Sequence, residues 1–174
     1  MEIIWLNWFL FVGIFTMALA SPGPDFVIAV RNSIVYSRKI GVATAMGFAA
    51  GVVVHMTYTL LGLSVLIAQS VVLFSLIKYA GAAYLFYIGV QALRSQGFEE
   101  NTPSVKPKKK EMSVSQALWS GFLTNALNPK ATLFFLAVFS QFMTPETAFA
   151  VKLFYASTCV VMTGLWFSVV AIIL

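Results

Sequence analysis

Charged residues are scarce in this sequence. They make up 10% of its 174 residues, whereas soluble domains carry about 25%. Hydrophobic residues make up 60%, and the mean hydropathy is +0.89. The composition excludes a soluble domain and predicts an all-α integral membrane protein with several spans. The net charge of +5 does not indicate a nucleic-acid partner, because the basic residues gather where they would orient membrane spans.

Cysteine and histidine occur only once each, as Cys159 and His55. A single cysteine excludes an internal disulfide and a CxxC redox pair. The sequence contains neither a nucleophile pair of cysteine and histidine nor an acidic cluster that would bind a metal. Four glutamates fall in predicted loops: Glu99, Glu100, Glu111 and Glu146. We therefore expect no enzyme activity, no cofactor and no metal site.

Long apolar runs dominate the rest of the chain. Five segments have membrane-spanning length, at about 3–30, 41–68, 71–93, 115–142 and 148–174. Polar residues separate them at 31–39, 69–70, 94–114 and 141–147. The predicted organisation is a first repeat of three spans (1–93), a polar basic loop (94–114) and a second repeat with two spans (115–174).

Proline and glycine interrupt the first span at Ser21-Pro22-Gly23-Pro24-Asp25. Proline removes a backbone donor and clashes with the preceding turn, and glycine tolerates unusual dihedral angles. The motif therefore predicts a broken helix that is followed directly by a carboxylate. Broken backbone at membrane depth is tolerated only where protein or a water-filled cavity surrounds it, so the break predicts a transport site.

A second break lies in the fourth span, at Asn125-Ala126-Leu127-Asn128-Pro129-Lys130. Setting Pro24 on Pro129 places Asp25 on Lys130, and an apolar helix follows in both places. Because three spans precede the second copy, it enters the membrane the opposite way up, which is typical of an inverted repeat. The match is short, and chance similarity is the alternative.

An inverted repeat of this kind predicts six helices in a 3+3 plan, of which this sequence provides five. Two explanations for the sixth helix stay open at this point. A second chain completes the fold, or the protein is truncated. A non-transporting membrane protein, or a subunit that needs a partner chain, is accordingly the alternative to a transporter.

Asp25 and Lys130 have opposite charges, and each would be unfavourable alone in a membrane. We expect both to face one cavity, with Asn128 beside them. Asp25 would receive a substrate ammonium or a coupling proton, and Lys130 a carboxylate. The alternative is an ion pair that only holds the two broken helices together.

A stripe of small residues ends at His55, because Ala43, Gly47, Gly51 and His55 recur every four residues and share one helix face. Close helix packing is the simpler interpretation of this small-residue stripe. The alternative is the wall of a substrate or ion path into which His55 points, with a pKa near 6.5 that suits proton relay.

Basic residues gather in two loops. Arg31, Arg38 and Lys39 follow the first span, and Arg94, Lys106 and Lys108–Lys110 follow the third. By the positive-inside rule, loops 31–39 and 94–114 are cytoplasmic and the N-terminus lies outside.

Several motifs together resemble the lysine exporter family, LysE/RhtB, and specifically its homoserine, threonine and homoserine-lactone efflux branch. The matching residues are Ser21–Asp25, Arg31–Ser33, Gly47–Gly51, Gly81–Leu85, Tyr87–Gly89, and Asn125–Lys130 before Phe134-Phe135. They extend from the first predicted span to the fourth.

The resemblance implies a bacterial inner-membrane exporter of amino acids or their derivatives. It implies six spans, transport driven by the proton motive force as in an antiporter, and an assembly that is often a homodimer. The expected partners are a small zwitterionic substrate, protons and the lipid bilayer. The motif residues that carry over are Pro22, Gly23, Pro24, Asp25, Asn128, Pro129 and Lys130.

Overall fold

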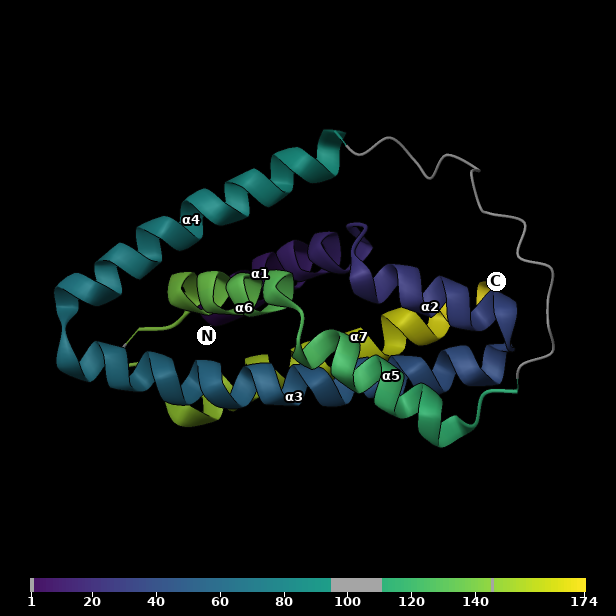
Figure 1. The fold of residues 1–174 in the computed structure, drawn as a ribbon. Helices are drawn as coiled ribbons and strands as arrows, with labels where there is room; N and C mark the ends of the chain where they lie inside the picture. Colours follow the sequence, from purple (N-terminus) through teal and green to yellow (C-terminus); the bar gives the residue numbers. More distant parts are fainter. Residues whose placement is uncertain (1, 95–110, 145) are drawn as a thin grey trace.

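The fold consists of α-helices and short connections. The computed structural model describes residues 2–94, 111–144 and 146–174, and these contain no strand. The helices are α1 (Glu2–Ala20), α2 (Pro24–Val35), α3 (Arg38–Gln69), α4 (Val71–Arg94), α5 (Val114–Ala126), α6 (Pro129–Phe142) and α7 (Phe149–Ile173) (Figure 1). The predicted all-α class is confirmed.

Two helices among the described residues, α3 and α7, are each long and apolar enough to cross a membrane. Two further spans are possible as bent pairs, with α1 and α2 meeting at 60° and α5 and α6 meeting at 57°. These bends confirm the predicted interruption of the first and fourth segments. The helix α4 coincides with the third predicted segment.

Proline begins the second helix of each bent pair. Pro24 and Pro129 occupy the first turns of α2 and α6, where their missing N–H would have no helical partner. Gly23 precedes α2 with φ −168° and ψ −178°, an extended conformation open to any residue. Gly23 makes no use of the dihedral freedom of glycine, so the prolines account for the break.

The predicted loop 31–39 is largely helical, which corrects the prediction. Helix α2 continues to Val35, and α3 begins at Arg38. Two buried polar side chains in this stretch have partners inside the protein, since Asn32 donates to Thr44 Oγ1 at 3.0 Å and Ser33 donates to the Ala29 carbonyl at 2.7 Å. The polar character of Asn32 and Ser33 therefore reflects buried hydrogen bonds rather than a loop. Most of the second predicted basic loop, 95–110, lies outside the described residues.

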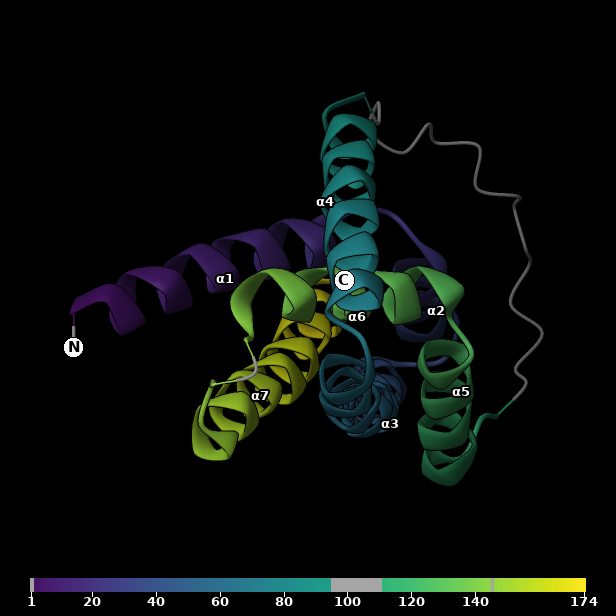
Figure 2. The same ribbon diagram turned by 90° about the vertical axis from the view of Figure 1, so that its left-hand side faces the viewer.

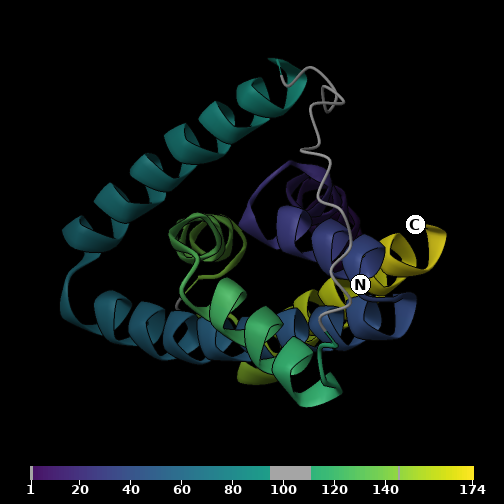
Figure 3. The same cartoon turned by 45° about the vertical axis from the view of Figure 1, so that its right-hand side comes forward.

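Helix α3 is the central element. Figure 2 looks along α3 and shows α5 and α7 on either side of it. Figure 3 looks along α6, which packs against α4. Helices from the first and second halves of the chain are thus interleaved in one body.

The small-residue stripe of α3 faces α5. A Cβ on Gly47 would overlap the Leu118 carbonyl, and a Cβ on Gly121 would overlap the Thr44 carbonyl. The two backbones therefore approach as closely as only glycine permits. This geometry agrees with the packing interpretation of the stripe. It also sets the position of the C-terminal end of α5.

Candidate substrate and ion site

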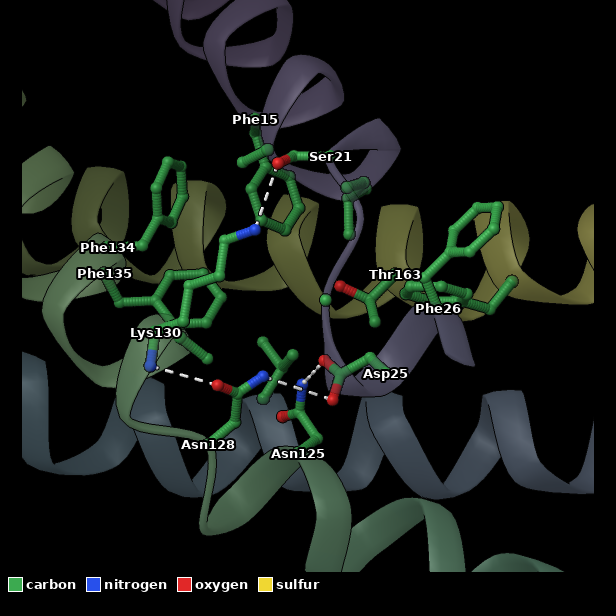
Figure 4. Close-up of a pocket in the computed structure, with 16 residues that line it drawn as sticks. Phe15, Ser21, Asp25, Phe26, Asn125, Asn128, Lys130, Phe134, Phe135 and Thr163 are labelled. Atoms are coloured by element: carbon green, nitrogen blue, oxygen red, sulfur yellow. Dashed lines mark hydrogen bonds between the residues drawn. The ribbon is translucent and has the colours of Figure 1, made fainter. Parts of the chain in front are cut away.

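The two helix breaks meet at one cavity of about 60 Å³. Its polar lining residues are Ser21, Asp25, Asn125, Asn128, Lys130 and Thr163. Its aromatic lining residues are Phe15, Phe26, Phe134, Phe135 and Phe167. Figure 4 shows the two charged residues reaching this space from opposite breaks. A cavity of this size holds a few water molecules and is smaller than the roughly 300–1,000 Å³ of typical small-molecule pockets.

The carboxylate of Asp25 is held by amides from the other break. Asn125 Nδ2 donates to Oδ2 at 2.7 Å, and Asn128 Nδ2 donates to Oδ1 at 3.3 Å. Asp25 also lies in the first turn of α2, where the helix dipole favours a negative charge. The protein therefore provides Asp25 with donors and a positive helix end inside an apolar region.

The ammonium of Lys130 reaches back to the first break. Its Nζ donates to Ser21 Oγ at 3.1 Å and to the Pro22 carbonyl at 3.2 Å. These acceptors follow directly after the C-terminal end of α1, where a positive charge is favourable. Each break is therefore braced by polar groups of the other.

Asp25 and Lys130 do not bond to each other within the described residues; the hydrogen bonds of each go to the neutral groups named above. The two charges line one cavity without closing it as an ion pair. Lys130 also lies in the first turn of α6, so the ammonium and the helix dipole both make this end of the cavity positive. The arrangement can accept a carboxylate at Lys130 and a cation at Asp25.

His55 lies behind the cavity wall. It is completely buried, its Nε2 lies 2.8 Å from the carbonyl oxygen of Asn125, and its Nδ1 contacts the Tyr58 hydroxyl. A carbonyl only accepts, so Nε2 carries the proton and Nδ1 accepts from Tyr58. His55 reaches the cavity through Asn125 and not directly.

Most of the predicted site residues come together. Asp25, Asn128 and Lys130 line the cavity together with Gly23, whereas His55 and the three prolines do not line it. His55 contacts Asn125 behind the cavity, and Pro24 and Pro129 begin α2 and α6. Asn128 has a second role, because its Oδ1 caps α6 by accepting the Lys130 N–H at 3.0 Å.

Three polar lining residues were not predicted as site residues. Ser21 and Asn125 stand inside the two break motifs, and their polar character in apolar runs was a usable signal. Thr163 stands in an unbroken apolar helix, where threonine commonly bonds to its own backbone, so the sequence carried no signal for it.

Comparisons with known proteins agree with this architecture. Residues 16–174 match the LysE type translocator family, which covers most of the chain and both breaks. The chain belongs to the LysE type translocator family. It is an integral membrane protein and a translocator rather than an enzyme, as the sequence predicted.

Named relatives of this LysE type translocator include efflux proteins. A threonine efflux protein of Escherichia coli K12 is 34% identical over 155 residues, which cover 89% of this chain and 75% of the relative. A homoserine/homoserine lactone efflux protein of Salmonella typhimurium is 29% identical over 139 residues, covering 80% and 66%. The membrane protein YrhP of Bacillus subtilis is 32% identical over 164 residues, covering 90% and 78%. No solved structure matches this chain.

Proposed function

We propose that this translocator is a secondary active exporter of small zwitterionic amino acids of the homoserine and threonine type, coupled to protons. The observation that carries the proposal is the cavity at which Asp25 of one break and Lys130 of the other meet. The efflux activities named for the relatives support the direction of transport and the substrate class.

The two charges match the two charged groups of an amino acid. Lys130 and the positive end of α6 would receive the carboxylate, because half-helix N-termini at such breaks commonly face anionic substrate groups. Asp25 would receive the ammonium. Asn125 and Asn128 hold the carboxylate of Asp25 in place before the substrate arrives.

Asp25 also offers a simple basis for proton coupling. A carboxylate can bind either a substrate ammonium or a proton, so the two compete for one site. Protonation of Asp25 from outside would release the amino acid there, and deprotonation towards the cytoplasm would restore the binding site. His55 would take part by holding the Asn125 carbonyl in place behind Asp25.

Alternating access would open the site to each side in turn. The cavity of about 60 Å³ is too small for an amino acid, so binding requires the helices around the breaks to separate. Bends of 60° and 57° at corresponding prolines support an inverted-repeat plan, with residues 1–93 and 115–174 as the moving units.

The location we propose is the bacterial inner membrane, with the N-terminus outside and residues 31–39 and 94–114 at the cytoplasmic side. The basic residues in these two segments support this orientation through the positive-inside rule.

Efflux from proteoliposomes tests the function directly. Vesicles filled with a mixture of amino acids are compared with and without an imposed proton gradient. We expect gradient-dependent loss of a few small zwitterions from wild-type vesicles, none from Asp25→Asn, and partial activity from Asp25→Glu. Absence of any loss from folded wild-type protein would contradict the proposal and favour a non-transporting membrane protein.

A charge exchange tests whether the two residues bind the substrate or only brace the helices. If the two residues acted only as an ion pair, the double variant Asp25→Lys with Lys130→Asp would recover both folding and transport. The proposal predicts that transport stays lost even where folding recovers, because the ammonium and carboxylate sites have changed places.

A further inference from the structure

The side chain of Thr163 in α7 is 1% exposed and lines the cavity between the two breaks. Its Oγ1 has no hydrogen-bond partner among the described residues. Figure 4 shows Thr163 above Asp25, with its hydroxyl oxygen turned toward the middle of the lining residues. An unpartnered buried hydroxyl is unfavourable, so its presence here needs an explanation.

Five other threonines among the described residues satisfy their hydroxyls locally, whereas the hydroxyl of Thr59 has no partner. Each of the five side chains donates to the backbone carbonyl four residues earlier: Thr16, Thr44, Thr57, Thr124 and Thr158. Thr163 lies in the middle of α7 and lacks this bond. Its hydroxyl therefore remains free as both donor and acceptor, on the side of the helix that faces the cavity.

We propose that Thr163 is a specificity-determining residue, whose hydroxyl hydrogen-bonds a hydroxyl on the side chain of the transported amino acid. The inference rests on the proposed export function. Asp25 and Lys130 already match the ammonium and the carboxylate of the substrate. A third polar group in the lining is therefore free to contact the substrate side chain. The aromatic side chains Phe26 and Phe167 line the same cavity and offer the substrate no further strong hydrogen bond.

The chemical class that follows is an amino acid with a short hydroxylated side chain. L-Threonine and L-valine form the matched pair of probes, because they differ by a hydroxyl in place of a methyl group. A site with a free hydroxyl partner favours the hydroxylated member, since binding the other leaves a buried polar group unpaired.

The test is the ratio of threonine to valine efflux rates from proteoliposomes that contain equal amounts of both. We expect wild-type protein to favour threonine and Thr163→Val to lower the ratio by about three- to tenfold. Thr163→Ser keeps the hydroxyl and should keep the preference.

Thr59→Val is the matched control. Thr59 is equally buried at 1% exposed and has an unpartnered hydroxyl, but it does not line the cavity. The same substitution there should leave the ratio unchanged, which separates a substrate contact from a general effect of replacing a buried threonine.

A binding measurement separates this inference from the proposed export. Purified protein in detergent is heated with and without each amino acid. Threonine should raise the melting temperature of wild-type protein and Thr163→Ser more than valine does, and this difference should disappear in Thr163→Val. Thr163→Val without ligand should melt no lower than wild type, because it loses an unpaired hydroxyl.

The outcomes are distinguishable. Export with a ratio that Thr163→Val does not change overturns the inference and leaves the function standing; the hydroxyl then only contacts water. Wild-type export without a preference for threonine overturns it as well. Selective stabilisation that depends on Thr163, without any efflux, supports the inference and contradicts export. Neither efflux nor stabilisation in the wild type overturns both.

Discussion

The Nδ2 atom of Asn125 lies 2.7 Å from Oδ2 of Asp25, although 100 positions separate the two residues in the chain. Asn125 lies in the last turn of α5 and Asp25 in the first turn of α2, so this hydrogen bond joins the two breaks. Asn125 is itself held by α3, through His55 at its carbonyl and Gly51 beside its side chain. The position of the Asp25 carboxylate therefore depends on three helices.

Replacing Asn125 by leucine removes the shorter of the two amide hydrogen bonds to Asp25. A bond to a charged group contributes about 1.5–3 kcal/mol, so we expect a loss of stability of this size and little remaining efflux. Thermal unfolding in detergent and proteoliposome efflux measure the two effects. Asn7→Leu on the exposed surface of α1 is the control and should change neither. Wild-type stability in Asn125→Leu would contradict the bracing role.

Gly51 leaves room for the Asn125 side chain. A Cβ at position 51 would lie 2.7 Å from Asn125 Oδ1 and 2.8 Å from its Cβ. Gly51→Ala should therefore displace Asn125, destabilise the protein by about 1–3 kcal/mol through overpacking, and abolish efflux.

Gly62→Ala is the matched control for this change, because it lies on the same helix with nothing within 4 Å of an added Cβ. It should be neutral or stabilising by up to about 1 kcal/mol, since alanine favours helix. Equal effects of the two substitutions, measured as melting temperatures, would show that the contact with Asn125 is unimportant.

Lys130→Met should remove the proposed carboxylate site while leaving the aliphatic part of the side chain. We expect loss of threonine efflux but a much smaller loss for an amine that lacks the carboxylate, such as 1-amino-2-propanol. The ratio of the two rates in proteoliposomes measures the effect. Lys152→Met in α7 serves as the control, and Lys130→Arg should keep part of the activity because it keeps the charge. Proportional loss of both substrates would assign Lys130 to bracing alone.

His55 donates from Nε2 to the Asn125 carbonyl and contacts Tyr58 through Nδ1, so both ring nitrogens already have protein partners. A glutamine at position 55 can still donate to the carbonyl but cannot carry a proton. We expect His55→Gln to keep gradient-dependent efflux and His55→Leu to lose both stability and efflux. Efflux from His55→Gln that no longer responds to the gradient would instead make His55 a proton carrier.

The membrane class, most of the helix positions and both breaks could be predicted from the sequence alone. These features depend on local chemistry, because apolar runs of about 20 residues match the bilayer and proline at a helix start leaves no place for the preceding turn. Asp25, Asn128 and Lys130 were found in the same way, as polar residues beside those breaks.

Only the tertiary structure decided how these groups are connected. The bracing of Asp25 by Asn125, the reach of Lys130 to Pro22, and the free hydroxyl of Thr163 depend on how helices distant in the chain pack together. The stretch 31–39 shows the same limit of prediction from sequence. Its polar side chains suggested a loop, whereas in the structure Asn32 donates a buried hydrogen bond to Thr44. The length of an apolar run and the position of a proline are local properties, whereas the partner of a buried polar group is set by the packing of the whole chain.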